Sequence, residues 1–282
     1  MAGSMKDIKL RIKSVEGTMQ ITKAMELVAS SKLRRARQKV EQSRPYFEVL
    51  ERTLTEIASA NLEYQSRYLA KREEKKALYI VIAGDRGLAG GYNSNMFKAV
   101  AAATEGRDFC VLPVGKKATE FYERRGAGIM TKAFAEVGDI SVADCFEIAR
   151  MVCKGFLAGE YDRVFLCYTE FVSMLSQQPR ITRVLPFVCP EGVDPKQNRN
   201  LIKYEPNSEE VFDAIIPEYV AGMVYGGICE SVASEQGARR TAMESATKNA
   251  KEMIENLNLY YNRARQGAIT QEITEIVAGA EH

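Results

Sequence analysis

The stretch that decides the fold is residues 8–57, IKLRIKSVEGTMQITKAMELVASSKLRRARQKVEQSRPYFEVLERTLTEI. One series of positions runs through it with steps of four and three that alternate throughout, which is the heptad repeat of a coiled-coil seam. Twelve of its fifteen positions are apolar, and Thr22, Glu26 and Ser43 are polar. The series is Ile8, Ile12, Val15, Met19, Thr22, Glu26, Ala29, Leu33, Ala36, Val40, Ser43, Phe47, Leu50, Leu54 and Ile57.

A helix of this length needs a partner or must protrude. At a rise of about 1.5 Å per residue it would be roughly 75 Å long, more than a domain is wide. Pro45 is expected to kink it or to mark a break, because proline removes a backbone hydrogen bond and clashes with the preceding turn.

The C-terminal part of the chain supplies a candidate partner. Residues 1–76 contain 17 Lys/Arg and 10 Asp/Glu, whereas residues 208–282 contain 6 and 12, so the two ends attract each other. We therefore predict an antiparallel two-helix coiled coil, with an ordinary helical bundle as the alternative. The predicted second seam is Met243, Ala246, Ala250, Met253, Leu257, Tyr260 and Ala264. Beyond it, Ile269, Ile273 and Ile276 are again apolar but lie on a shifted face.

The middle of the chain alternates between strand and helix patterns, which predicts a Rossmann-like α/β domain with a parallel sheet and right-handed crossovers. The predicted domains are residues 1–76 and 208–282 for the coiled-coil helices and 77–207 for the α/β part. Expected strands are Ala77–Ala83, Phe109–Val114, Asp162–Thr169 and, at an edge because of Pro186, Arg180–Val188. Expected helices are Asn93–Thr104, capped by Asn93 or Ser94, Lys116–Arg125, and one capped by Ser141 that ends near Leu157. Residues 189–207 are expected to form a loop.

A glycine-rich loop follows the first of these strands in LYIVIAGDRGLAGGYNSN, residues 78–95. Its glycine spacing fits neither the Walker loop nor the Rossmann fingerprint, and no Lys-Ser/Thr pair follows. Arg86 and the following helix N-terminus are compatible with a phosphate. We favour a tight strand-to-helix turn in which another part of the backbone comes close.

Few residues of the chain suit catalysis or metal binding. The six cysteines are scattered without a C-x-x-C motif, and the one histidine, His282, excludes a Ser-His-Asp triad. We expect reduced structural thiols, no cofactor and no metal. The N-terminus lacks the apolar region of a secretory signal. The sequence contains no run of eighteen uncharged apolar residues, so we predict no membrane span. We expect a protein of the cytosol that reaches a membrane only through partners.

Three separated motifs carry a resemblance to a known family. ITKAMELVASSKLRRA, residues 21–36, resembles the N-terminal signature of the γ subunit of bacterial F-type ATP synthases. Residues 234–280 resemble its C-terminal signature, and AGDRGLAGGYN resembles its central loop. The resemblance implies a central-stalk rotor shaft that turns inside an α3β3 hexamer and couples ion flow through the c-ring to ATP synthesis or hydrolysis, without an active site of its own. It also implies the ε subunit as a partner, no nucleic acid, and a place on the cytoplasmic side of the bacterial cell membrane.

The same resemblance assigns contact residues. Those implied to face β are Met25, Lys32, Arg34, Arg35, Asp85, Arg86, Leu88, Arg265, Gln266 and Thr270. Ile273, Ile276 and Val277 are implied to turn in the hexamer sleeve, and Tyr204 and Glu205 to meet the c-ring and ε. Gly267 departs from the family's alanine and weakens the helix beside Gln266 by about 1 kcal/mol.

Each assignment has a simpler alternative. The basic run of residues 32–39 fits a solvated helix face, and Met25 fits ordinary seam packing. Two other functions compete with the rotor shaft: a coiled-coil protein that binds nucleic acid through the basic run, and a small nucleotide-binding enzyme built on the middle domain. The acidic opposite end argues against the first, and the loop spacing with the lack of histidine argues against the second.

Overall fold

The computed structural model describes residues 5–60, 66–70, 72–73, 75–188, 204–205 and 207–280. The chain forms two compact units, one of Met1–Ser30 with Arg239–His282 and one of Ser31–Ala238. We call them the shaft unit and the α/β unit. Two long helices, α1 (Met5–Ala60) and α5 (Ser208–Ala280), contribute to both. Most of the loop predicted over residues 189–207 lies outside the described residues.

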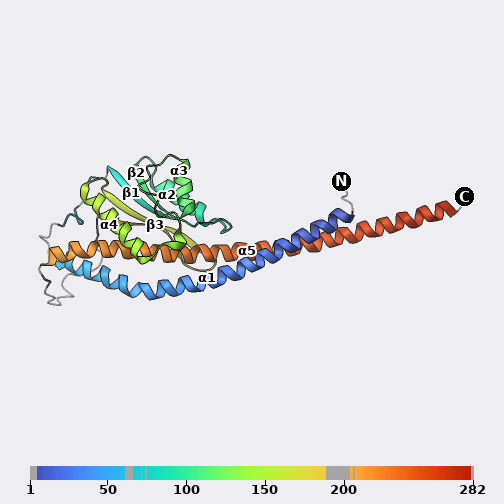
Figure 1. Cartoon of the computed structure of the whole chain (residues 1–282), viewed down its shortest axis with the longest axis horizontal. Coiled ribbons are helices and arrows are strands. Elements are labelled where there is room, and N and C mark those ends of the chain that lie inside the picture. Colours follow the sequence, from blue (N-terminus) through green and yellow to red (C-terminus); the bar gives the residue numbers. More distant parts are fainter. Residues whose placement is uncertain are drawn as a thin grey trace. The chain divides into compact units, whose positions relative to one another are not determined.

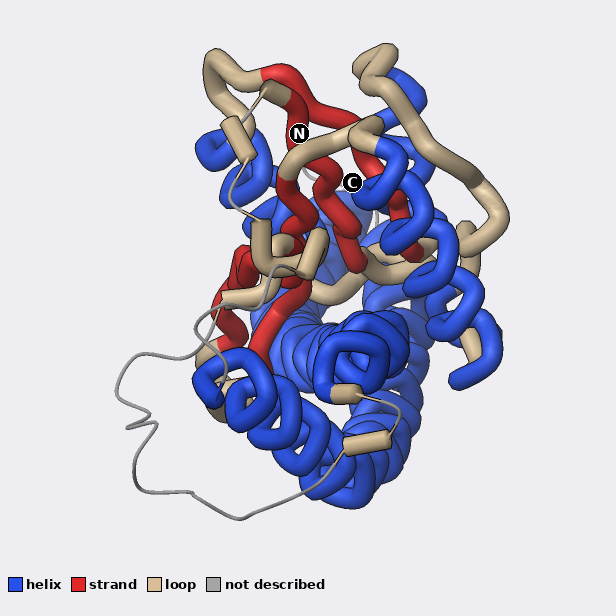
Figure 2. Tube along the Cα trace, turned by 90° about the vertical axis from the view of Figure 1, so that its left-hand side faces the viewer, coloured by secondary structure: helices blue, strands red, loops and turns tan. Residues whose placement is uncertain are grey.

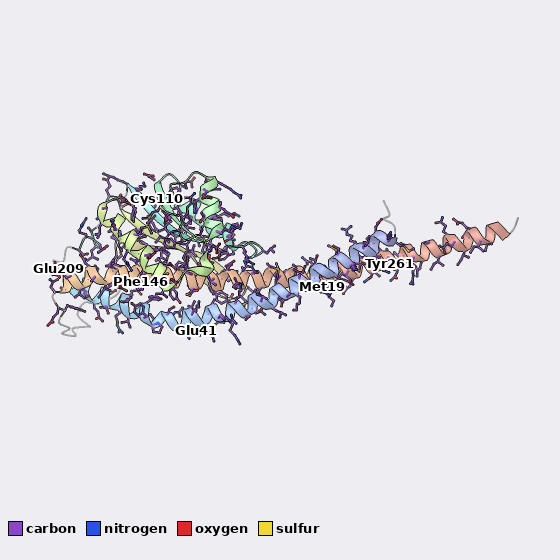
Figure 3. All side chains as sticks on the ribbon, in the orientation of Figure 1. Met19, Glu41, Cys110, Phe146, Glu209 and Tyr261 are labelled. Carbon is purple, nitrogen blue, oxygen red and sulfur yellow. The ribbon has the colours of Figure 1, made fainter. Side chains whose placement is uncertain are left out.

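The shaft unit is an antiparallel pair of helices, as predicted. Its two segments run in opposite directions (Figure 1), and Met19 and Tyr261 lie one on each helix (Figure 3). A hydrogen bond between the Thr22 and Thr247 hydroxyls, 2.8 Å long, fixes which levels of the helices face each other.

The heptad prediction for α1 is confirmed along its whole length. All fifteen predicted seam positions are buried or half-buried, whereas most residues between them are exposed. Of the two outcomes expected at Pro45, a kink or a break, the break is wrong, because α1 continues through Pro45 as one helix. Proline removes a single backbone hydrogen bond, and the neighbouring turns keep theirs.

The predicted seam of α5 is wrong at two positions. Met253 and Tyr260 are 45% and 61% exposed, and their neighbours Ile254 and Tyr261 are half-buried instead. A heptad seam can step by three or by four residues at each turn, so two adjacent residues compete for each of these seam positions. Both residues of each competing pair are apolar or aromatic: Met253 and Ile254, and Tyr260 and Tyr261. The facing helix therefore decides which of them is shielded. The shielded series is Met243, Thr247, Ala250, Ile254, Leu257, Tyr261 and Ala264.

The α/β unit is built on a four-stranded sheet of order β2-β1-β3-β4. β1 (Lys76–Ile82) pairs in parallel with β2 (Asp108–Val114) and with β3 (Arg163–Phe171), as predicted. β4 (Gln177–Leu185) lies at an edge, as predicted, but is antiparallel to β3, so the expectation of a wholly parallel sheet is wrong. The connection of residues 172–176 is a hairpin, and a parallel return needs a dozen residues or more.

Helices cover both faces of the sheet (Figure 2). Side chains alternate along β1. Leu78, Ile80 and Ile82 therefore pack with α4 (Val142–Ala158) and α5, while the residues between them pack with α2 (Tyr92–Ala103) and α3 (Lys116–Arg124). A 3-10 turn, η1 (Val137–Asp139), precedes α4.

The helix caps agree with the predictions at one helix and differ at another. Ser141 caps α4, as the sequence predicted, and the structure shows that it does so in a capping box with Asp144. Asn93 and Ser94 do not cap α2, because the N-cap residue is Gly91 and makes no side-chain cap bond. The Asn93 side chain instead accepts a hydrogen bond from the Gly84 amide, 2.9 Å away, so it ties the glycine-rich loop to the helix.

Within the α/β unit, α1 and α5 also run antiparallel. Leu54 and Ile57 of α1 join one core cluster with Phe212 and Ile216, near the start of α5. Leu33 joins another cluster farther along, with Ala233. By length and composition alone, α5 contains a window apolar enough to cross a membrane, but half of that window is buried inside the protein. This is the burial expected of a core helix.

Candidate functional site

The glycine-rich loop after β1 is held by its own aspartate. One carboxylate oxygen of Asp85 accepts hydrogen bonds from the amides of Lys116 and Val137, at 3.1 and 2.9 Å, and the other from Gly138, at 3.2 Å. Lys116 is the first residue of α3, so Asp85 occupies the position at this helix N-terminus where an anion binds. This arrangement supports the structural interpretation of the loop over a phosphate site.

Gly84 lies where another part of the chain comes close. A Cβ atom built on it would lie 2.7 Å from Oε1 of Glu235, whose side chain is buried. The Gly84 carbonyl also accepts a hydrogen bond from the Lys117 amide, 3.0 Å away. The loop is therefore fixed between α3 and α5, and the sequence did not reveal Glu235 as its neighbour.

The tip of the loop is exposed. Arg86 and Gly87 are exposed, and Leu88 is 65% exposed with a φ of 60°. A leucine in the left-handed region is uncommon and costs of order 1–3 kcal/mol. The loop thus presents an arginine and a strained, solvent-facing leucine from a rigid base.

The basic run occupies exposed positions of α1 beside the seam. Lys32, Arg34 and Arg35 are exposed. Arg37 lies 3.8 Å from Glu41, and its guanidinium stands 5.8 Å from the centre of the Phe171 ring. Met25 is half-buried between the seam positions 22 and 26. This geometry fits both a solvated face and a contact with an acidic partner.

The distal part of α5 is almost wholly exposed. Residues 265–267 and 269–277 are exposed, among them the predicted contacts Arg265 and Gln266. Thr270 donates a hydrogen bond to the Gln266 carbonyl, 2.9 Å away. The predicted sleeve residues Ile273, Ile276 and Val277 are 57%, 71% and 56% exposed. Exposed apolar side chains of this number on one helix mark an interaction surface.

Tyr204 and Glu205 lie beside the base of α5. Tyr204 packs against the core cluster that contains Leu54 and Phe212. Burial raises its pKa, and the nearby Glu56 raises it further. Glu205 is exposed. Tyr204 is therefore anchored to the core, and Glu205 faces solvent.

Among the described residues, no group of three or more His, Cys, Asp or Glu side chains is placed to hold a metal ion. The described cysteines are free thiols, and four of the five are buried. Burial raises the pKa of Cys145 and of Cys153 to about 12, so both stay protonated at neutral pH. They are unsuited to nucleophilic chemistry there.

A cavity of about 190 Å³ lies between α1, α5 and β3, with Phe47, Tyr168 and Tyr219 in its wall. None of the predicted contact residues lines it. Most of the predicted residues are exposed, and they belong to separate parts of the chain: Met25, the basic run, the loop tip, the distal part of α5, and the Tyr204–Glu205 pair. Such surfaces suit contact with other proteins better than chemistry on a small molecule.

The comparison with known proteins shows to which family the chain belongs. A family model described as ATP synthase matches residues 4–282. The ATP synthase gamma chain of Ruminococcus albus is 48% identical over 279 residues, which cover 97% of this chain and 96% of that one. This chain belongs to the family of ATP synthase gamma chains.

A further relative agrees with this membership, and a solved structure shares the fold. The sodium ion specific ATP synthase gamma chain of Acetobacterium woodii is 43% identical over 299 residues and covers 100% of this chain and 99% of its own. In a Euglena gracilis mitochondrial ATP synthase structure of OSCP, F1 and the c-ring, one chain matches with a TM-score of 0.70 at 20% identity. It covers 98% of this chain and 93% of its own. At that identity, this second match shows only that the two chains share a fold.

Proposed function

We propose that the chain is the central-stalk rotor subunit of an F-type ATP synthase and has no catalytic activity of its own. Its membership in the gamma family, at 48% identity over nearly the whole chain, carries this proposal. As part of that membrane-bound complex, it works with the α3β3 hexamer, the ε subunit and the c-ring. We place it on the cytoplasmic side of a bacterial membrane, where only those partners connect it to the bilayer.

The coupling rests on differential contact. A shaft that presents a different face to each β subunit in turn stabilises a different β conformation at each one, and nucleotide affinity follows that conformation. The two helices make the shaft stiffer than a single helix. Their exposed side chains, rather than a pocket, supply the contacts.

The surfaces described above are assigned to these contacts as follows. Met25 and the exposed Lys32, Arg34 and Arg35 face acidic moving segments of β. The loop residues Asp85, Arg86 and Leu88 lie near β at the base of the shaft, with Asp85 acting through its support of the loop. The exposed distal residues of α5 engage the hexamer: Arg265, Gln266 and Thr270 meet a β loop, and Ile273, Ile276 and Val277 turn in the sleeve.

The remaining assignments concern the Tyr204–Glu205 pair and the division of the chain into domains. Tyr204 and Glu205 meet the c-ring and ε. Residues 1–76 and 208–282 supply the coiled coil, and residues 77–207 supply the α/β domain. The packing of Tyr204 against the core and the exposure of Glu205 support a surface of fixed position at these two residues.

Co-purification from the native host tests the proposal. The tagged chain, released gently from membranes, is expected to bring down two larger subunits in threefold molar excess, with ATPase activity that the free chain lacks. Recovery of the chain alone, or with nucleic acid, would overturn the proposal. Saturable nucleotide binding by the free chain would instead support the nucleotide-enzyme alternative.

A further inference from the structure

Thr22 is a polar residue in an otherwise mostly apolar seam, and it has a partner on the other helix. Its side chain is buried, and its hydroxyl lies 2.8 Å from the hydroxyl of Thr247, on the facing seam of α5. Each hydroxyl also contacts a carbonyl of its own helix, Thr22 that of Met19 at 3.0 Å and Thr247 that of Met243 at 2.8 Å.

Two hydroxyl hydrogens thus serve three short contacts. When Thr22 donates across the seam, Thr247 donates to the Met243 carbonyl; when Thr247 donates across, Thr22 donates to the Met19 carbonyl. In both arrangements each hydroxyl has an acceptor, so the pair is buried without an unsatisfied donor. In either of these two arrangements, one hydrogen bond joins the helices.

Within the shaft unit, apolar contacts alone specify the register of the two helices weakly. The apolar seam opposes separation of the helices, but apolar contact is non-directional, and a heptad seam offers similar apolar neighbours one repeat away. If the helices shifted by one heptad, Thr22 would lie level with Ile254 or Arg240, and Thr247 would lose its hydroxyl partner. Only the present register brings these two hydroxyls together. A single buried polar position that fixes coiled-coil register is well attested.

We propose that the Thr22–Thr247 hydroxyl pair sets the axial register of the two shaft helices. The pair thereby fixes the axial position of Met25 on α1 relative to that of Arg265 on α5. The consequence for the complex rests on the proposed function, since a shift of one heptad would displace one contact level from the other by about 10 Å.

Disulfide trapping in the full-length chain measures the register directly. One reporter pairs Val15→Cys with Ile254→Cys, which lie level in the present register; a second pairs Val15→Cys with Tyr261→Cys, one heptad away. Mass mapping of the cross-linked peptides separates these products from the six native cysteines. The ratio of in-register to shifted product is compared in four backgrounds: the native chain, Thr22→Val, Thr22→Ser and Thr18→Val.

Thr22→Val keeps the side-chain shape and leaves the Thr247 hydrogen with the Met243 carbonyl, so the helices still form. It is expected to lower the ratio roughly three- to tenfold, the range that one neutral hydrogen bond supports. Thr22→Ser keeps the hydroxyl and is expected to restore the ratio. Thr18→Val is the matched control, because Thr18 is exposed and donates to the Ser14 carbonyl of its own helix.

An unchanged ratio in Thr22→Val, or an equal fall in Thr18→Val, would overturn the inference. If Thr22→Val fails to fold, Thr247→Val tests the same hydrogen bond from the other helix. ATP synthesis by the assembled complex is a separate measurement. A register loss without loss of synthesis would refute the functional consequence alone, and failure of the chain to assemble with its partners would refute the proposed function alone.

Discussion

Phe47 of α1 fills the space that a side chain at Gly222 of α5 would need. A Cβ atom at Gly222 would lie 2.4 Å from two carbon atoms of the Phe47 ring, closer than real Cβ contacts occur. One turn along the same helix, a Cβ at Gly226 would meet that ring at an ordinary 3.8 Å. The Phe47 ring therefore occupies a notch on α5, which exists because Gly222 has no side chain and which Gly226 borders.

Gly222→Ala is expected to destabilise the chain by about 1–3 kcal/mol, because the ring must leave its position or the helices must part. Gly226→Ala is the matched control. It adds the same methyl group without a clash and is expected to stabilise α5 by up to about 1 kcal/mol through helix propensity. Urea unfolding measures the free energy of unfolding of both variants. Equal changes in the two variants would contradict a steric clash specific to Gly222.

Asp85→Ala is expected to destabilise the loop by about 1–3 kcal/mol, since three amide donors lose a charged acceptor. One of these three donors is the Lys116 amide, the first of α3, which therefore loses its cap. Hydrogen exchange at Lys116, Val137 and Gly138 should quicken. Glu105→Ala removes an exposed carboxylate and serves as the control; unchanged exchange at those three amides in Asp85→Ala would rule out this role.

Arg265→Ala is expected to lower ATP synthesis by the assembled complex about tenfold, the factor that a charged hydrogen bond supports. The side chain is exposed, so the unfolding midpoint of the free chain should not change. Arg263→Ala removes the same charge two residues away, from another exposed position. A similar loss of synthesis in both variants would point to net charge rather than to a specific contact of Arg265.

Gly267→Ala is expected to stabilise the distal part of α5 by about 0.5–1 kcal/mol, because Gly267 has no neighbour within 4 Å of a Cβ and alanine favours the helix. Slower hydrogen exchange around residues 263–271 would record it. Gly90→Ala provides the opposite case, since Gly90 has a φ of 57° that alanine rarely adopts. Exchange that quickens in Gly267→Ala would mean that this glycine is needed for the helix as it stands.

Alkaline pH is expected to destabilise the chain. Burial raises the pKa of Cys145 and Cys153 from the ordinary 9.0 to about 12 in the folded state. The unfolded thiols ionise first, so stability is full below pH 9 and falls as the pH rises toward 12. At pH 10.5 the loss is about 2 kcal/mol for each thiol.

Thermal unfolding between pH 8 and pH 10.5 measures this loss. Cys145→Ala should make the dependence on pH shallower, whatever its effect on stability at pH 8. An unchanged slope would show that this thiol does not contribute to the alkaline instability.

The local elements were largely predictable from the sequence. Each of the predicted strands and helices exists, and the seam of α1 is shielded at every predicted position, because an alternation of three and four over fifty residues fits only one helix face. Ser141 caps α4 as predicted, because a cap involves residues that are close in sequence. The site surfaces were identified through a family resemblance, since exposed arginines and isoleucines carry no local signal of what they touch.

The sequence by itself determined that two long helices of opposite charge flank an alternating α/β segment. Helix periodicity, capping and strand patterns act over a few residues, so they can be read along the chain. Only the tertiary structure decided the orientation of β4, the choice of Ile254 and Tyr261 over Met253 and Tyr260, and the contacts of Gly222 with Phe47 and of Thr22 with Thr247. The contacts between α1 and α5 depend on which surfaces face each other across more than a hundred residues of chain, and the orientation of β4 depends on its pairing with β3. No periodicity of one segment contains that information.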